Sequence, residues 1–443
     1  MMNIGFVTAM SGRWPRELPQ ERDRLYGDYM QKEFPSAKII RCGYLVDSAA
    51  RAKEAAHLFK RENVNLIVMV YGAFTGDDIC TCLAEESGVP IIMWAPFEPP
   101  FDGGRLLANA LVALTMNAAS MNRLGYANHA IYGSFDDDKA ADRLRKVVKS
   151  YETVEKLSGK LLGLFGYRPT AFYNSAFDEA LIRRIFKVRI EETSLKVVFD
   201  VMGDIDSELV KKDMDSISGK YDTCLPEGHL ENHSRLYLAL KQVMKAQGYD
   251  YSALKCWPEM GVLKTTPCAV LSRLADDGFH IGCEGDVDAA LTLMLQNTIC
   301  GKPAFVTDMI NIDEAENFLT FWHCGNAAPS LMDSSQPIEL RNHPLAGQGS
   351  AFYGGLKTGV ATIARLCNIQ GVYKLFLSKG TALPTKPNTK GVMTNIQIKS
   401  DVRDFVYQLI DWQVPHHYSI VWEDIADDMK CAAKLLGIDV LEI

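Results

Sequence analysis

Short apolar runs alternate with longer amphipathic segments along the first third of the chain. The apolar runs predict buried strands, and the segments with helical spacing predict helices packed beside them. The expected order is strand 3–8, helix 19–34, strand 38–42, helix 49–62, strand 66–71, helix 77–87, strand 90–94, and helices 104–124 and 137–157. This alternation is typical of a parallel, doubly wound α/β sheet.

A second α/β cycle begins near residue 160, and the pattern changes after residue 301. The middle of the chain predicts strand 160–165, helix 178–187, strand 195–200, helix 230–247 and strand 254–257. Short β-like runs follow, at 304–307, 320–322, 373–378, 392–398 and 418–422. Because Gly, Pro and Asn separate these runs, they predict a small antiparallel barrel or sandwich, and the glycine-rich stretch 349–355 is expected to be a flexible loop.

These patterns divide the chain into three predicted domains. A chain of 443 residues is too long for one ordinary hydrophobic core. We expect an N-terminal Rossmann-like domain over 1–158, a second Rossmann-like domain over 159–301, and a C-terminal, mainly antiparallel β-barrel domain over 302–443. The fold class is therefore α/β.

The composition indicates a globular protein that acts on small molecules. Hydrophobic residues make up 47% of the chain and charged residues 23%, close to the average for such domains. The formal net charge of −8, without a cluster of Lys and Arg, argues against a nucleic-acid partner. Scattered cysteines, no export leader and no membrane-length apolar run predict a cytoplasmic protein with no membrane contact.

The glycines of the two Rossmann-like domains do not form a nucleotide-binding pattern. The turn after the first strand, residues 9–14, and the second turn, residues 163–166, both lack the Gly-x-Gly-x-x-Gly spacing. We therefore expect no organic cofactor.

Two carboxylates stand at the ends of predicted strands. Glu284 lies where an apolar strand ends and a helix begins, and Asp286 is placed to cap that helix. Asp308 ends the next apolar run, one helix and one strand later. The two strand-end carboxylates, Glu284 and Asp308, can meet at one edge of adjacent strands. Spacing alone favours an ordinary structural role, in which Glu284 and Asp286 serve the helix N-terminus and Asp308 begins a polar turn.

Three histidines add a second kind of ligand to these carboxylates. His323 follows an aromatic pair, and His416 and His417 stand between a proline and a β-like run. Carboxylate oxygens with one or two imidazoles favour Mn²⁺ or Mg²⁺ over a thiolate-type zinc site.

Taken together, these residues resemble the L-fucose isomerase and L-arabinose isomerase superfamily. The resemblance rests on Cys-Glu-Gly-Asp-Val-Asp-Ala-Ala-Leu at 283–291, on Asp308, on Trp-His-Cys-Gly-Asn at 322–326, and on the late His-His pair. It implies two Rossmann-like domains followed by a β-barrel. It also implies that Glu284, Asp308 and His417 hold Mn²⁺, or another divalent cation such as Mg²⁺ or Co²⁺.

The resemblance implies further residues that contact the substrate. The arabinose branch uses a second His ligand and a Glu as its second carboxylate, whereas this chain has Asp308 in the fucose-like manner and His323 in the arabinose-like place. We expect His323 to contact the sugar, and a role as fourth ligand stays open. Asn326, His416 and Trp257 are the other expected contacts, although packing explains Trp257 equally well.

Aldose–ketose isomerisation is the activity that the resemblance implies. Moving a proton between C1 and C2 requires a base, an acid and a group that stabilises the enediolate, which a divalent ion bound to O1 and O2 provides. Glu284 and Asp308 would combine ligation with proton transfer, and which of them is the base stays open because the pair titrates together. The expected substrate is a hexose, deoxyhexose or pentose of the L-fucose or L-arabinose kind, which reacts through a cis-enediol.

Arg13 and Arg16, in the loop after the first strand, suggest an alternative substrate. Guanidinium groups bind sulfonate, carboxylate or phosphate through paired donors. The alternative is therefore the same reaction on a 6-deoxy-6-sulfo-hexose, sulfoquinovose to sulfofructose. Solvated arginines or intersubunit salt bridges are the other interpretation of this loop.

Two expectations concern the assembly and the class of protein. The resemblance implies a homo-oligomer, with a hexamer expected, in which a neighbouring subunit completes each site. The alternative of another class is a non-catalytic sugar-binding protein, because two Rossmann-like domains around a cleft also describe such proteins. That class predicts an export signal and does not explain Glu284, Asp308 and His417.

Overall fold

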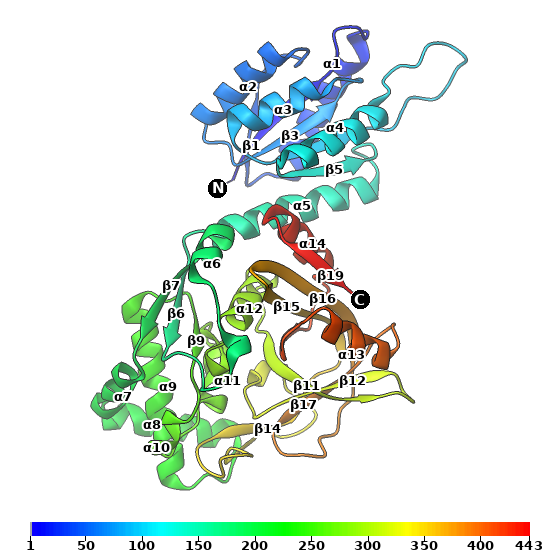
Figure 1. Ribbon diagram of the computed structural model, residues 1–443. Coiled ribbons are helices and arrows are strands. Elements are labelled where there is room, and N and C mark those ends of the chain that lie inside the picture. The colour runs from blue at the N-terminus through cyan, green and yellow to red at the C-terminus, as the bar shows by residue number, and fades with distance from the viewer. Residues whose placement is uncertain (1) are drawn as a thin grey trace. The chain divides into compact units, whose positions relative to one another are not determined.

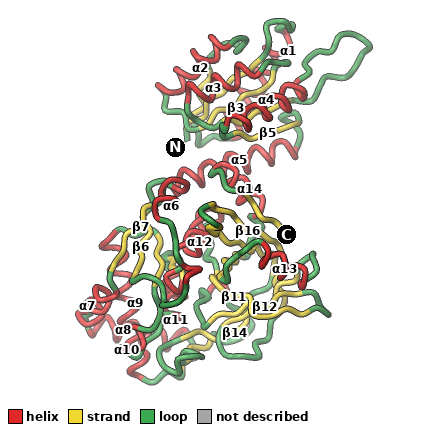
Figure 2. Tube along the Cα trace, in the orientation of Figure 1, coloured by secondary structure: helices red, strands yellow, loops and turns green. Residues whose placement is uncertain are grey.

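The computed structural model describes residues 2–443 and divides the chain into two compact units, Met1–Glu152 and Thr153–Ile443. Figure 1 shows the course of the chain, and Figure 2 shows where its helices and strands lie. In the described part of the chain, no helix combines the length and the apolar character needed to cross a membrane.

The first unit contains a five-stranded parallel sheet in the order β2-β1-β3-β4-β5 (Figure 1). Its elements are β1 (Asn3–Ala9), α1 (Glu17–Glu33), β2 (Lys38–Arg41), α2 (Ala49–Arg61), β3 (Leu66–Tyr71), α3 (Asp77–Ser87), β4 (Ile91–Ala95), α4 (Ala110–Leu124), β5 (Asn128–Tyr132) and α5 (Asp138–Leu157), which continues into the second unit. Strands β3 and β4 are buried along their whole length, as expected for continuous apolar runs covered on both faces. The predicted doubly wound sheet is confirmed.

The segment before α4 differs from the prediction. The helix begins at Ala110, whereas the pattern predicted it from residue 104. Two prolines and two glycines between residues 99 and 104 disfavour helix there. The Glu98 carboxylate instead accepts hydrogen bonds from the backbone N–H groups of Leu107, Ala108 and Asn109.

The second unit contains a four-stranded parallel sheet in the order β10-β9-β6-β7. The elements up to residue 300 are β6 (Leu161–Phe165), η1 (Tyr173–Ser175), α6 (Glu179–Phe186), β7 (Arg189–Thr193), α7 (Leu195–Asp204), α8 (Ser207–Lys220), β8 (Asp222–Thr223), α9 (Glu227–Gln247), β9 (Tyr251–Leu254), α10 (Glu259–Val262), α11 (Cys268–Asp276), β10 (His280–Gly282), η2 (Cys283–Gly285) and α12 (Val287–Cys300). This confirms the second α/β cycle.

Residues 195–200, predicted as a strand, form the first turns of helix α7 instead. Leu195, Val198 and Met202 are buried at helical spacing, and the Ser194 hydroxyl caps the helix by accepting the N–H of Lys196. A short apolar run alone does not distinguish a strand from the buried face of a helix. Here the Ser194 cap and the spacing of the buried residues favour a helix.

Six antiparallel strands close into a barrel in the order β16-β15-β18-β11-β12-β17, because β17 also pairs with β16. The elements of this part are β11 (Phe305–Asp313), β12 (Phe318–His323), η3 (Pro329–Leu331), β13 (Glu339–Arg341), β14 (Ala351–Gly355), β15 (Gly359–Ile369), β16 (Val372–Leu383), β17 (Val392–Gln397), α13 (Val402–Asp411), β18 (His417–Val421), α14 (Ala426–Leu435) and β19 (Asp439–Glu442). Of the two predicted architectures, the barrel is confirmed.

The glycine-rich stretch 349–355 was predicted as a flexible loop, but most of it forms strand β14. This strand pairs with β13 and with the barrel strand β17. A Cβ on Gly355 would lie 2.2 Å from the carbonyl oxygen of Thr385, so glycine permits a close approach of two backbones here.

The second sheet and the barrel share one hydrophobic core. Leu162 of the sheet, Leu291 of α12 and Leu375 of the barrel belong to the same buried cluster. Helix α12 therefore joins the two layers. The division of this unit at residue 301 stays a prediction, and so do the other domain limits.

Candidate active site

Glu284 occupies a strained turn between strand β10 and helix α12. Its φ of 57° is left-handed, a conformation that costs a residue with a side chain about 1 kcal/mol or more. The next residue, Gly285, lies so close to the loop after strand β6 that a Cβ would be 1.8 Å from the carbonyl oxygen of Tyr167. This turn fixes the direction of the Glu284 side chain, which is mostly buried.

Asp286 caps helix α12, as the sequence predicted, and has two further partners. Its carboxylate accepts the N–H of Ala289 at 2.9 Å and lies 2.9 Å from a guanidinium nitrogen of Arg365, a fully buried residue of strand β15. It also lies 2.9 Å from Nδ1 of His417. Burial would raise the pKa of Asp286, but Arg365 and His417 outweigh burial and hold it below the usual range.

His417 is oriented by Asp286 toward the other carboxylates. Because the ionised Asp286 can only accept, Nδ1 of His417 carries the proton and donates it. The opposite nitrogen, Nε2, lies 3.4 Å from Glu284 Oε2 and 3.9 Å from Asp308 Oδ1. Burial would lower the pKa of His417, but its contacts with Asp286 and Glu284 raise it to about 10. The surrounding carboxylates therefore favour a positive charge at this ring, which a proton or a metal ion at Nε2 would supply.

Strand pairing brings Asp308 beside His417. The two residues are directly opposite each other in the antiparallel pair β11–β18. Asp308 Oδ1 and His417 Nε2 are buried atoms without a hydrogen-bond partner among the residues that the structure describes. Two such atoms 3.9 Å apart, with Glu284 3.4 Å from His417 Nε2, fit a site that a metal ion completes.

His416 joins this group more closely than the sequence predicted. Ligand atoms of Glu284, His416 and His417 all lie within 4.8 Å of one another. Burial would raise the pKa of Glu284, but the two histidines outweigh burial and hold it below the usual range. These three residues are candidate donors for a divalent ion, although His416 was predicted to contact substrate. Asp308, the remaining predicted ligand, lies outside this group and is the fourth candidate donor, with Oδ1 3.9 Å from His417 Nε2.

His323 lies at the end of strand β12, with its ring centre 6.1 Å from that of His417. Its Nδ1 accepts the backbone N–H of Cys324 at 2.8 Å, and burial lowers its pKa. A neutral ring with this hydrogen bond carries its proton on Nε2. His323 is then arranged to donate a hydrogen bond, which favours the predicted substrate contact over a role as ligand.

The aromatic side chains of Trp257 and Phe172 lie next to His416. Trp257 follows strand β9, is 41% exposed, and has its ring centre 5.5 Å from that of Phe172. The Phe172 ring in turn lies 6.0 Å from the ring of His416. This exposure and position fit the stacking role predicted for Trp257. Asn326, another predicted contact, donates to the carbonyl of Val306, while its buried Oδ1 has no partner within residues 2–443.

Arg13 and Arg16 belong to the first unit, in the loop after β1. Arg16 forms an ion pair with Asp47 of the same chain, whereas the alternative interpretation of this loop was a salt bridge between subunits. The carbonyl of Arg13 accepts a hydrogen bond from Arg105, and the Arg13 side chain is exposed. Binding of an anion by these two residues stays a prediction.

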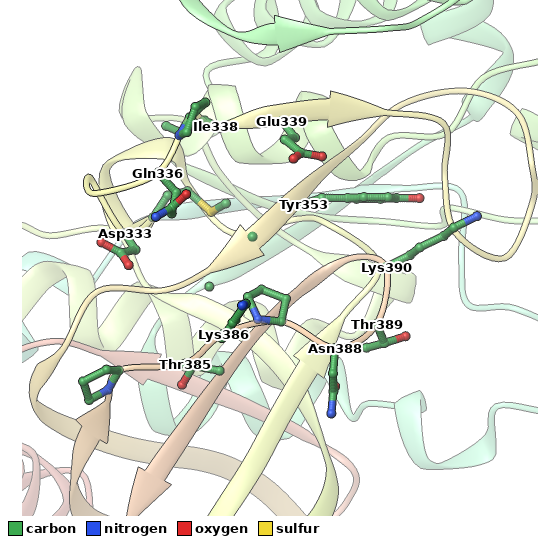
Figure 3. A pocket seen from close by; sticks show the side chains of 16 residues that line it. Asp333, Gln336, Ile338, Glu339, Tyr353, Thr385, Lys386, Asn388, Thr389 and Lys390 are labelled. Atoms are coloured by element: carbon green, nitrogen blue, oxygen red, sulfur yellow. The ribbon is translucent and has the colours of Figure 1, made fainter.

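A separate cavity of about 870 Å³ lies beside strand β14 and the loop 384–390. Figure 3 shows the side chains of Glu339, Tyr353 and Lys390 around it. None of the four candidate metal donors lines this cavity. A hydrogen bond connects the loop 384–390 to strand β12: the Trp322 indole donates to the carbonyl of Lys390 at 2.8 Å.

Sequence reasoning missed two residues that shape the site. Arg365 neutralises Asp286, and the Asn174 amide lies 2.6 Å from Nδ1 of His416, although the two residues are 242 positions apart. Neither residue stands in a local motif. Only the tertiary fold brings them to the site.

Two parallel sheets, a closed C-terminal barrel and a buried carboxylate–imidazole cluster define the class: an α/β protein with a site suited to a divalent metal ion. The comparisons with known proteins place it more narrowly. The chain is similar to sulfoquinovose isomerases and, over a shorter part, to L-arabinose isomerases, which is consistent with the expected superfamily of L-fucose- and L-arabinose-type sugar isomerases. No protein-family profile matches it.

Three curated relatives illustrate this placement. The chain is 24% identical to a sulfoquinovose isomerase of Alkalicoccus urumqiensis, with 84% of each chain covered. It is 27% identical to a sulfoquinovose isomerase of a Clostridium species, with 79% of this chain and 80% of the relative covered. An L-arabinose isomerase of a Nocardioides species is 22% identical over 52% of this chain and 47% of its own length.

Among solved structures, a solute-binding protein of Burkholderia multivorans covers 68% of this chain and 94% of its own length. Its identity of 10% and TM-score of 0.21 are too low to relate the two folds.

Proposed function

We propose that this protein is a divalent-metal-dependent aldose–ketose isomerase. One observation supports the proposal above the others: Glu284 and Asp308 both approach Nε2 of His417, at 3.4 and 3.9 Å, and the buried atoms Asp308 Oδ1 and His417 Nε2 have no hydrogen-bond partner among residues 2–443. The curated relatives are sugar isomerases, which agrees with this chemistry.

Glu284, Asp308 and His417 would hold the ion, with His416 beside them. Their oxygen and imidazole donors suit Mn²⁺, with Mg²⁺ or Co²⁺ as alternatives. Such an ion supplies a Lewis acid for the negative charge that develops on the two reacting sugar oxygens.

The side chains of the site carry out the proton transfers. A carboxylate of the Glu284–Asp308 pair takes the proton from C2 of the aldose, the electron pair forms the C1–C2 double bond, and O1 gains a proton. The cis-enediol then loses the proton of O2, and C1 gains one, which gives the ketose. His323 would donate to a sugar oxygen, and Trp257 would pack against the apolar face of the sugar.

Two substrates are candidates within this chemistry. The first is the neutral sugar of the L-fucose or L-arabinose kind that the sequence suggested. The second is a sulfonated hexose, and it is favoured by coverage: sulfoquinovose isomerases match 79% to 90% of the chain, whereas an L-arabinose isomerase matches about half. We also propose a homo-oligomeric assembly, as the superfamily resemblance implies.

A substrate panel tests the proposal. The Mn²⁺-loaded protein is incubated with L-fucose, L-arabinose, D-arabinose and sulfoquinovose, and ketose is measured in each sample. We expect ketose from at least one sugar and none after treatment with a chelator. Equal turnover by the chelated protein would refute the role of the metal.

A further inference from the structure

The segment 166–177, which connects strand β6 to helix α6, lies against the candidate active site. The carbonyl of Tyr167 contacts Gly285, next to Glu284. The ring of Phe172 and the amide of Asn174 both approach His416. In parallel α/β sheets, ligands bind at the carboxyl ends of the strands, where this segment begins. Its side chains are therefore placed to contact a sugar.

Arg168 in this segment is a partly buried cation without a counter-charge. Within residues 2–443, seven arginines are not exposed. The six besides Arg168 bind carboxylates or backbone carbonyls: Arg22, Arg41, Arg235, Arg273, Arg341 and Arg365. Among the residues that the structure describes, Arg168 has neither kind of partner, and its Nε is buried without a hydrogen bond. Leaving this Nε donor shielded from water without an acceptor is unfavourable, and a ligand that binds the guanidinium would relieve the cost.

Two tyrosines hold the Arg168 guanidinium in place. Its central carbon lies 5.4 Å from the ring centres of both Tyr167 and Tyr173. Cation–π contacts of this kind orient the guanidinium but do not satisfy its N–H groups. Pro169 follows directly and restricts the backbone of Arg168 to extended conformations. The guanidinium is thus restricted in direction, and its terminal nitrogens have no partner among residues 2–443.

We propose that Arg168 binds the anionic group of a charged sugar substrate, an inference that rests on the proposed isomerase function. The carboxylates Glu284 and Asp308 would repel a second negative charge, so the anion must lie at the end of the sugar away from C1 and C2. Arg168 offers paired donors there, the geometry that sulfonate, phosphate and carboxylate groups prefer. Arg16, by contrast, is already paired with Asp47.

The test compares an anionic sugar with its neutral counterpart. Wild type and Arg168→Gln are assayed with sulfoquinovose and with 6-deoxy-D-glucose, which lacks the sulfonate. Glucose 6-phosphate and glucuronate form separate arms for phosphate and carboxylate. Arg168→Lys retains the charge without the paired donors, and Arg184→Gln, an exposed arginine of α6, is the matched control. Binding of each sugar is measured calorimetrically beside kcat and KM.

We expect Arg168→Gln to lower the preference for the anionic over the neutral sugar roughly 10- to 100-fold, the loss that a charged hydrogen bond implies. Most of this loss should be in KM and in the binding constant. The preference of Arg168→Lys for the anionic sugar should lie between those of wild type and Arg168→Gln. The preference of Arg184→Gln should match that of wild type. Unchanged Mn²⁺ affinity and thermal unfolding would show that Arg168→Gln is folded.

The failures of the inference and of the proposed function are distinguishable. An unchanged preference in folded Arg168→Gln overturns the inference, as does wild type that isomerises neutral sugars but neither binds nor isomerises any anionic one. Wild type that binds sulfoquinovose through Arg168 but forms no ketose from any sugar refutes the isomerase function and retains the anion site.

Discussion

At the scale of single residues, Glu284 carries both strain and charge. Its left-handed backbone and the glycine after it hold the carboxylate opposite His417. Glu284→Gln keeps the volume but removes the charge and the basicity. We expect turnover to fall roughly a hundredfold or more, while the thermal unfolding temperature stays close to that of wild type. Substantial activity in this variant would exclude Glu284 as ligand and base.

Asp286 orients the proposed ligand His417 and neutralises Arg365. Asp286→Asn would leave Arg365 buried and unpaired, which costs about 3–5 kcal/mol of the free energy of unfolding. It would also weaken Mn²⁺ binding roughly 10- to 100-fold, because the imidazole loses its partner. Denaturant unfolding and metal titration measure the two effects. Wild-type Mn²⁺ affinity in the variant would contradict the orienting role.

Part of the site was predictable from single residues in sequence. The strand-to-helix junction located Glu284 and its neighbour Asp286, because a capping carboxylate before a helix has a local signature. The partners Arg365 and Asn174 were not predictable. Their contacts join positions far apart in the chain and depend on how the barrel meets the second sheet.

At the scale of elements, helix α12 is joined to the barrel by buried charges. Asp288 accepts a hydrogen bond from the Tyr373 hydroxyl at 2.5 Å, and Arg365 of strand β15 lies nearby. Burial, which outweighs the opposing effect of Arg365, raises the pKa of Asp288 to about 7. Between about pH 4 and pH 7, the Asp288 carboxyl is therefore protonated in the folded protein. In the unfolded chain, where a carboxyl has a pKa of about 3.9, it is ionised over the same range.

This shift predicts a pH dependence of stability. Because the folded-state pKa is raised, the contribution of Asp288 is fully present below about pH 4 and is lost as the pH rises through about 7. Asp288→Asn should remove this dependence, so that the stability of the variant relative to wild type increases between pH 5 and pH 8. Denaturant unfolding at both pH values measures it. A difference independent of pH would contradict the raised pKa.

The elements themselves were predictable to different degrees. Long periodic segments such as α2 and α3 stand where the pattern placed them. Residues 195–200 were assigned wrongly, because a short apolar run fits both a strand and one face of a helix. The alternation after residue 301 indicated a barrel or sandwich, but the opposition of Asp308 and His417 depends on strand register, which the sequence does not reveal.

At the scale of the whole molecule, the proposed divalent ion would link the β10–α12 turn to strands β11 and β18 of the barrel. An ion that binds only the folded protein stabilises it by about 2.7 kcal/mol at a hundred times its Kd. We expect Mn²⁺ to raise the thermal unfolding temperature of the chelated protein by several degrees. Glu284→Gln should show a smaller rise. No shift at saturating Mn²⁺ would contradict the proposed site.

The most direct test of the account is NMR spectroscopy of the Mn²⁺-loaded protein with neutral aldoses and sulfoquinovose in D₂O. Proton transfer through a cis-enediol predicts ketose that carries deuterium at C1 wherever the abstracted proton exchanges with solvent. The same samples with chelator should contain aldose alone. Absence of ketose from every sugar, with Mn²⁺ bound, would contradict the claim that this protein is an aldose–ketose isomerase.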